Sequence, residues 1–150
     1  MIEYPEQNAY MAEILRDVND EQIKKWMDPE NLVGKNRREF AGFEIVDSID
    51  GGIDENREVS LVTLKAVDQY PQHIHKNSDA YFIITKGSAK LLSGREERII
   101  MEGEKIEIPR GKPHGFEIAE GEQLEFISIQ SPPIKNHETG EEDLHLTDII

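Results

Sequence analysis

From residue 40 onward the sequence consists of short runs in which apolar and polar side chains alternate, and turns containing glycine separate the runs. A period of two with frequent turns predicts an antiparallel all-β sandwich or barrel. The expected strands cover residues 41–48, 58–67, 79–86, 88–93, 96–101, 104–109, 114–119 and 122–130. The turns between them are expected at Asp50-Gly51-Gly52, Lys86-Gly87, Ser93-Gly94, Glu102-Gly103, Arg110-Gly111 and Glu120-Gly121. Tight hairpins need the positive φ that glycine offers, so we expect an antiparallel meander.

The segment before residue 40 has the spacing of a helix rather than that of a strand. Apolar side chains recur at helical intervals in two groups between residues 8 and 28, which predicts two short helices. Asn19 is placed to cap the second helix, with Gln22 three residues later, and Pro29 is expected to end it. This helical lead should pack on the strands that follow.

The 150 residues fit a single domain, which we divide into a helical lead (1–39), a barrel (40–131) and a C-terminal tail (132–150). Residues 137–150 hold five acidic side chains and no Lys or Arg. Most such tails are solvated. The apolar Leu144, Leu146, Ile149 and Ile150 favour instead a tail that docks on the barrel or on a second subunit, and the sequence leaves both alternatives open.

Composition removes several classes of function. The chain has 17 basic and 31 acidic residues, a formal charge of −14 and no cysteine, so disulfides and thiol chemistry are impossible. The negative surplus disfavours nucleic acid and anionic membrane surfaces as partners. The N-terminus has neither a basic region nor an apolar segment of the kind that opens a secretory signal, so we expect a cytoplasmic protein. Small molecules and other proteins remain as partners.

Two histidines, His73 and His75, flank Ile74 within the β region. On an extended strand, residues two apart point to the same face and lie about 6 to 7 Å apart along the chain. Their imidazoles can therefore converge on a single metal ion. A third histidine, His114, follows a turn that contains proline and glycine.

The surroundings of these histidines resemble two motifs of the cupin superfamily. Residues 103–114 read GEKIEIPRGKPH and fit the second motif, GxxxxxPxGxxH. Residues 73–87 read HIHKNSDAYFIITKG and resemble the first motif, HxHxxxxE followed by six residues and a glycine. The resemblance covers about residues 58–131. It implies a double-stranded β-helix, the cupin jelly-roll barrel, which follows the short N-terminal helical segment that the apolar spacing predicts.

One position departs from the first motif in a way that affects the metal site. Ala80 occupies the place of the glutamate, so the resemblance implies only three of the four usual ligands, His73, His75 and His114. Asp79 lies one residue before the position of the glutamate. Neighbouring residues on a regular strand face opposite sides, so Asp79 could be a fourth ligand only if a bulge realigned it.

The resemblance also implies a pocket inside the barrel. In the cupin register, the inward side chains are apolar: Ala80, Phe82, Ile84, Phe116 and Ile118. Inward-facing aromatics are more often core packing than ligand contacts. Tyr81 and Glu125 are the polar residues nearest the motifs, and each is a candidate catalytic acid or base, with surface exposure as the alternative.

Three neutral imidazoles on a divalent ion leave its charge uncompensated and leave coordination positions open. Imidazole suits Fe, Mn, Ni and Zn, so the ligands do not select the metal. Cupins with three histidines include non-haem iron dioxygenases, so the resemblance implies an oxygenase-like enzyme acting on a small oxygenated molecule, and commonly a homodimer. Lewis-acid catalysis on the same ion, a non-catalytic ligand-binding cupin, and a metal-independent sugar isomerase or epimerase are the alternatives.

Overall fold

The computed structural model describes residues 14–15, 17–32, 37–40, 43–46, 49, 57–65, 70–134, 138–139 and 141–147. These residues form mostly strands, which confirms the all-β prediction. The helices are α2 (Asp20–Met27) and α3 (Pro29–Leu32). The strands are β1 (Arg37–Phe40), β2 (Phe43–Val46), β3 (Glu58–Lys65), β4 (Tyr70–Ile74), β5 (Asp79–Ser93), β6 (Glu96–Met101), β7 (Lys105–Ile108), β8 (His114–Glu117), β9 (Gln123–Ser131) and β10 (His145–Leu146).

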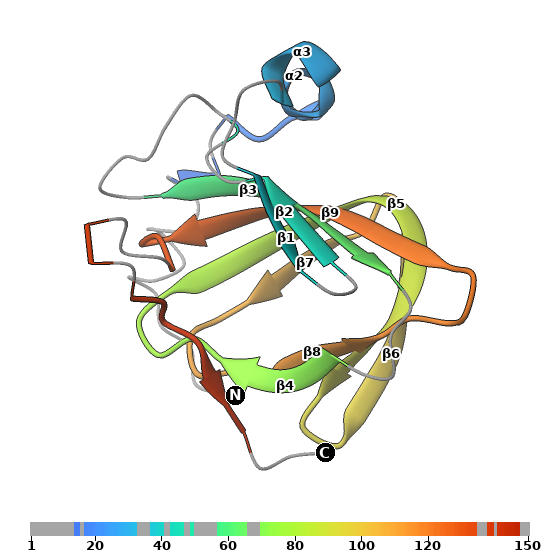
Figure 1. Ribbon diagram of the computed structural model, residues 1–150, viewed down its shortest axis with the longest axis vertical. Coiled ribbons are helices and arrows are strands. Elements are labelled where there is room, and N and C mark those ends of the chain that lie inside the picture. Colours follow the sequence, from blue (N-terminus) through green and yellow to red (C-terminus); the bar gives the residue numbers. More distant parts are fainter. Residues whose placement is uncertain are drawn as a thin grey trace.

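The strands form a curled sheet in the order β1-β2-β3-β9-β5-β8-β4-β10, with β6 and β7 each paired to β5 (Figure 1). Every pair is antiparallel, as predicted. The expected meander is wrong, because strands far apart in sequence are neighbours: β3 pairs with β9 and β4 pairs with β8. These crossovers give the jelly-roll barrel that the motifs implied.

Strand β5 is one continuous strand of 15 residues and not the hairpin predicted at Lys86-Gly87. Its first half pairs with β7 and β9, and its second half pairs with β6 and β8. The register shifts between Ile84 and Lys86, and Gly87 has a φ of 81°. A β-carbon at Gly87 would lie 1.8 Å from the carbonyl oxygen of Gln123. Glycine here permits a bulge that bends the strand from one side of the barrel to the other.

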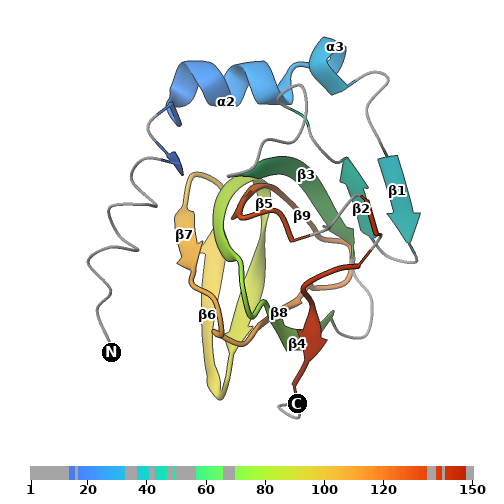
Figure 2. The same ribbon diagram turned by 90° about the vertical axis from the view of Figure 1, so that its left-hand side faces the viewer.

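Strands β3 and β9 are buried on both faces. Their even-numbered apolar residues, such as Leu64 and Phe126, belong to the core inside the barrel. Their odd-numbered apolar residues, such as Val59 and Ile127, pack on the outside with Trp26 of α2. Figure 2 shows α2 lying across this outer face. A strand that is covered on both faces carries consecutive apolar residues, so its sequence pattern does not tell which side chains face inward.

Asn19 caps α2 as predicted, since its side chain accepts a hydrogen bond from the Gln22 backbone N–H at 2.9 Å. Pro29 follows the end of α2 and opens the short α3. The helix predicted before α2 and the turn at residues 50–52 lie largely outside the described residues. No helix in the described part of the chain is long and apolar enough to cross a membrane.

The C-terminal segment docks on the barrel, which decides between the two alternatives for the tail. Strand β10 pairs with β4, with His145 opposite Ile74 and Leu146 opposite His73. The Thr147 backbone N–H then donates to the Gln72 carbonyl at 3.2 Å. The tail therefore adds a strand beside β4, which carries His73 and leads directly into His75.

Candidate metal centre

Strands β4 and β8 bring the three histidines together. His73 lies in β4, His75 directly follows it, and His114 opens β8 opposite His73. Their ring centroids are 4.3 to 5.0 Å apart, and one nitrogen from each ring lies within 4.8 Å of the others. We call these residues the histidine group. Spacing in the sequence predicted that His73 and His75 converge, the resemblance to the cupin motifs implied that His114 joins them, and the structure brings all three together.

A close approach of β8 to β4 helps to set this geometry. A β-carbon at Gly115, the residue after His114, would lie 2.7 Å from the Tyr70 carbonyl oxygen. The register of β4 against β8 shifts between Tyr70 and His73. Glycine at this position lets the two backbones lie close enough for the imidazoles to meet.

Each histidine of the group contacts a backbone carbonyl through Nδ1. The distances are 3.3 Å from His73 to Pro71, 3.0 Å from His114 to Lys112, and 2.5 Å from His75 to Asp143. A carbonyl can only accept, so the contact requires a proton on each Nδ1. This tautomer leaves the lone pair on Nε2, and fixing the ring through its other nitrogen is the usual arrangement behind a metal-binding histidine.

Burial also keeps the group neutral. Burial, with His75 nearby, lowers the pKa of His73 to about 4. Burial and the neighbouring His73 lower the pKa of His114 to about 3. Burial lowers the pKa of His75 as well, although Asp143 partly opposes this. Neutral imidazole is the form that binds metal ions, so the site suits a cation near neutral pH.

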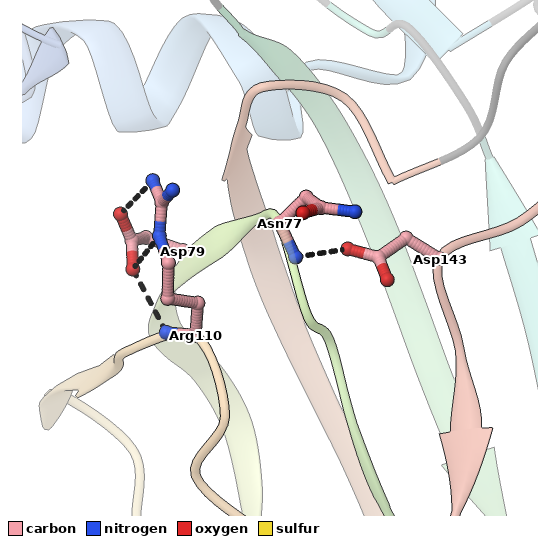
Figure 3. A network of polar contacts seen from close by, with 4 residues as sticks. All are labelled: Asn77, Asp79, Arg110 and Asp143. Carbon is pink, nitrogen blue, oxygen red and sulfur yellow. Dashed lines mark hydrogen bonds and ion pairs between the residues drawn. The ribbon is translucent and has the colours of Figure 1, made fainter.

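Two carboxylates fix the turns beside the histidine group, Asp143 the turn between β4 and β5 and Asp79 the turn between β7 and β8 (Figure 3). Asp143 accepts hydrogen bonds from the backbone N–H groups of Lys76 at 2.9 Å and Asn77 at 2.7 Å. Asp79, which is fully buried, accepts from the backbone and side chain of Arg110 at 2.8 and 2.9 Å. The turn that precedes His114 is thereby fixed to the strand that follows His75.

Asp79 does not join the histidine group. The start of β5 pairs regularly, with Asp79 opposite Ser131 and Ala80 opposite Gln130. The side chain of Asp79 therefore faces away from that of Ala80, which lies in the core. The bulge that could have realigned it falls after Ile84, too late in the strand. Its carboxylate is bound to Arg110 instead.

A cavity of about 210 Å³ adjoins the histidine group. Of the five residues expected to line it, Phe82 and Phe116 do so, while Ala80, Ile84 and Ile118 lie in the core cluster that surrounds them. Phe126 completes an aromatic side, with its ring centroid 4.6 Å from that of Phe82. The described residues that line the cavity are Ile45, Glu58, Val62, Leu64, Tyr70, His73, His75, Phe82, His114, Gly115, Phe116, Phe126, Ser128, Gln130, Ile134, Glu142 and Leu144.

Sequence reasoning missed the polar residues on β3 and β9. Glu58, Ser128 and Gln130 line the cavity, and their exposed fractions are 1%, 3% and 9%. Glu58 and the inward-facing Val62 both lie at even positions of β3, and residues an even number apart on a strand face the same side. The sequence did not reveal this orientation, because β3 also carries apolar residues on its other face.

Tyr81 and Glu125 lie on the outer side of the sheet. Tyr81 packs against the outer apolar cluster, where burial raises the pKa of its hydroxyl. The carboxylate of Glu125 accepts a hydrogen bond from the Thr85 hydroxyl at 2.9 Å. Neither is among the described residues that line the cavity.

Comparison with known proteins identifies the barrel region. Residues 60–130 match the family model described as "Cupin domain". A stretch of 85 residues, 57% of this chain, is 33% identical to a mannose-1-phosphate guanylyltransferase from Salmonella montevideo. That stretch spans only 18% of the guanylyltransferase, so the likeness concerns one part of a much longer protein.

Solved structures share the fold at low sequence identity. A variant of Streptomyces PAC13 solved with uridine has a TM-score of 0.60 at 13% identity, over 79% of this chain and 89% of that one. The polyketide cyclase RemF from Streptomyces resistomycificus has a TM-score of 0.59 at 20% identity, over 79% and 84%. A cupin sugar phosphate isomerase from Silicibacter pomeroyi has a TM-score of 0.58 at 20% identity, over 65% and 71%.

Proposed function

We propose that this chain, whose residues 60–130 match the cupin domain, binds one divalent transition metal ion through His73, His75 and His114. We also propose that it acts on a small oxygenated molecule as a metal-dependent enzyme. The observation that carries the proposal is the set of three contacts between Nδ1 and a backbone carbonyl. They leave three Nε2 lone pairs at one end of a cavity with an aromatic side. Such a donor set fits Fe, Mn, Ni or Zn.

The residues of the chain prepare this site in two ways. The backbone carbonyls of Pro71, Lys112 and Asp143 hold the imidazoles in one tautomer. The phenylalanines beside them give the cavity an apolar side, and electrostatic interactions are stronger in apolar surroundings than in water. A bound ion would supply Lewis acidity and, if it is redox-active, oxygenase-type chemistry.

We test metal binding first, by elemental analysis of protein purified without a chelating tag and then reconstituted with each metal in turn. The proposal expects one ion per chain in the wild type and close to none in His114→Ala. Lys112→Ala is the matched control, because it keeps the backbone carbonyl that contacts His114. A wild-type stoichiometry near zero after every reconstitution would overturn the proposal.

Oxygenase-like activity is the first reaction type we propose for the metal-loaded protein. It is tested with an oxygen electrode on small diketones, enols and hydroxy acids. Uptake of dioxygen that depends on iron, substrate and His114 supports it. Conversion of a substrate without dioxygen uptake would assign Lewis-acid chemistry instead.

Ala80 favours a second candidate, a cupin that binds a small ligand without catalysis, because a carboxylate ligand is missing from the motif. That candidate predicts that His114→Ala leaves ligand binding intact. The metal-independent sugar isomerase has less support. That candidate needs a tyrosine acid in the cavity. Tyr70 is the tyrosine among the described lining residues, and its hydroxyl proton is already donated to the Lys65 carbonyl at 2.7 Å.

A further inference from the structure

We propose that Glu58, Ser128 and Gln130 form a second binding surface, the polar wall, which receives a hydroxyl group of a single-ring oxygenated ligand whose other end lies at the histidine group. This inference deepens the proposed function and rests on it. It assigns a role to three buried polar residues from two strands that carry no cupin motif. It also narrows the ligand from any small oxygenated molecule to one of defined size and polarity.

Strand register places the polar wall inside the barrel. Glu58 of β3 is opposite Gln130 of β9, which is opposite Ala80 of β5. In the next row, Ser128 is opposite Phe82. Residues opposite each other share a face of the sheet, and Ala80 and Phe82 belong to the core inside the barrel. The polar side chains therefore face the interior, and all three line the cavity.

The cavity has one polar surface on each of two sides. The histidine group comes from β4 and β8, whereas the polar wall comes from β3 and β9, which lie across the barrel (Figure 1). Phe82, Phe116 and Phe126 line the space as well. A ligand that fills it must present polar atoms at two ends and an apolar face between them.

A buried carboxylate is costly unless it is hydrogen-bonded or paired. Glu58 makes contacts within the protein, and a carboxylate offers about four lone-pair sites, so it can keep these contacts and still accept a hydrogen bond from a ligand. The Gln130 amide donates to the Ser128 hydroxyl at 3.1 Å, which orders these two side chains. The polar wall thus offers an acceptor held in place before the ligand binds.

The cavity has room for about one ring of a ligand. An apolar cavity of about 150 Å³ can hold benzene. At about 210 Å³, this cavity has room for one ring with a few substituents. The chemistry at the two ends sets a further limit. A bound divalent ion with open coordination positions would take oxygen donors, so the ligand needs a hydroxyl beside a carbonyl at that end and a further hydroxyl facing Glu58.

Kojic acid and allomaltol test this inference as a matched pair. Both are single-ring hydroxypyranones that chelate divalent metals, and they differ only in one hydroxyl, since allomaltol has a methyl group where kojic acid has a hydroxymethyl group. We would measure both dissociation constants by calorimetry on Zn²⁺-loaded wild type, Glu58→Gln and Glu117→Gln. Glu117→Gln is the control, because Glu117 lies exposed on β8.

The wild type should bind kojic acid about tenfold more tightly than allomaltol, as expected for one hydrogen bond to a charged acceptor. Glu58→Gln should reduce the preference to about twofold, and Glu117→Gln should retain it. Equal affinities in the wild type, or an unchanged preference in Glu58→Gln, would overturn the inference. The zinc content of the same samples separates the claims: full zinc without a preference contradicts the polar wall alone, whereas a lack of zinc contradicts the proposed function on which it rests.

Discussion

The histidine group and the polar wall lie on different sides of one cavity, but the sequence encodes them differently. The histidine group comes from two motifs around β4 and β8, and the spacing of residues within each motif sets its geometry. Both sides also depend on strands that are far apart in the chain, since β4 pairs with β8 and β3 pairs with β9. The difference is that no motif surrounds the residues of the polar wall, so that side of the cavity becomes visible only once the barrel has closed.

Removal of a ligand from the histidine group should have the largest effect. We expect His114→Ala to lower metal affinity by about 1000-fold, because one of three imidazole ligands is lost, and loss of a group that merely orients a ligand already costs about 10- to 100-fold. Competition with a chromophoric chelator would measure it. Glu58→Gln, on the other side of the cavity, should leave metal affinity within about twofold, and an equal loss in both variants would contradict the division between the two surfaces.

Gly87→Ala should disturb both surfaces, since β5 crosses from one side of the barrel to the other at this residue. We expect the free energy of unfolding to fall by about 3 kcal/mol, from a positive φ and a clash with the Gln123 carbonyl. Denaturant unfolding would measure it. Gly103→Ala is the matched control, with a φ of 94° but no atom within 4 Å of the added carbon, and should cost about 1 kcal/mol. Equal losses would show that the clash does not matter.

Asp79→Asn tests whether the buried carboxylate supports the fold or the metal. Loss of its charged hydrogen bonds to Arg110 should lower the free energy of unfolding by about 2 kcal/mol. Metal stoichiometry should stay at one per chain. If the variant kept its stability and lost its metal, Asp79 would have to be a ligand after all.

The docked tail should make a smaller contribution to the histidine group. Asp143→Ala removes the carboxylate that holds the backbone of Lys76 and Asn77, while keeping the carbonyl that contacts His75. We expect metal affinity to fall by about tenfold. The exposed neighbour Glu141 is the control, and Glu141→Ala should have no effect. An unchanged affinity in Asp143→Ala would show that the tail does not position the site.

The histidine group should also make stability depend on pH in the metal-free protein. The pKa of His73 is about 4 and that of His114 about 3, below the usual value of 6.5. Between about pH 4 and pH 6.5, these two histidines therefore bind more protons in the unfolded chain than in the folded protein. The free energy of unfolding should fall as the pH decreases through this range. His73→Gln should have a flatter profile, and a profile identical to that of the wild type would contradict the lowered pKa.

The sequence predicted the fold class and the histidine group because each rests on local patterns: a period of two, glycine turns and two motifs. It failed where one local signal fits two structures. Lys86-Gly87 suits both a hairpin and a bulge, and only the pairing of β5 with its neighbours decides between them. Glu58 was missed for a related reason, because both faces of β3 are buried. The docking of the tail depends on contacts with β4 that sequence patterns do not reveal.

A crystal structure of reconstituted protein, with anomalous data collected on both sides of the metal's absorption edge, tests the central claim most directly. We expect a single anomalous peak within about 2.0 to 2.2 Å of Nε2 of His73, His75 and His114. Each Nδ1 should remain in contact with its carbonyl. A reconstituted crystal without a peak among the three rings, or with the ion bound elsewhere, would contradict the account.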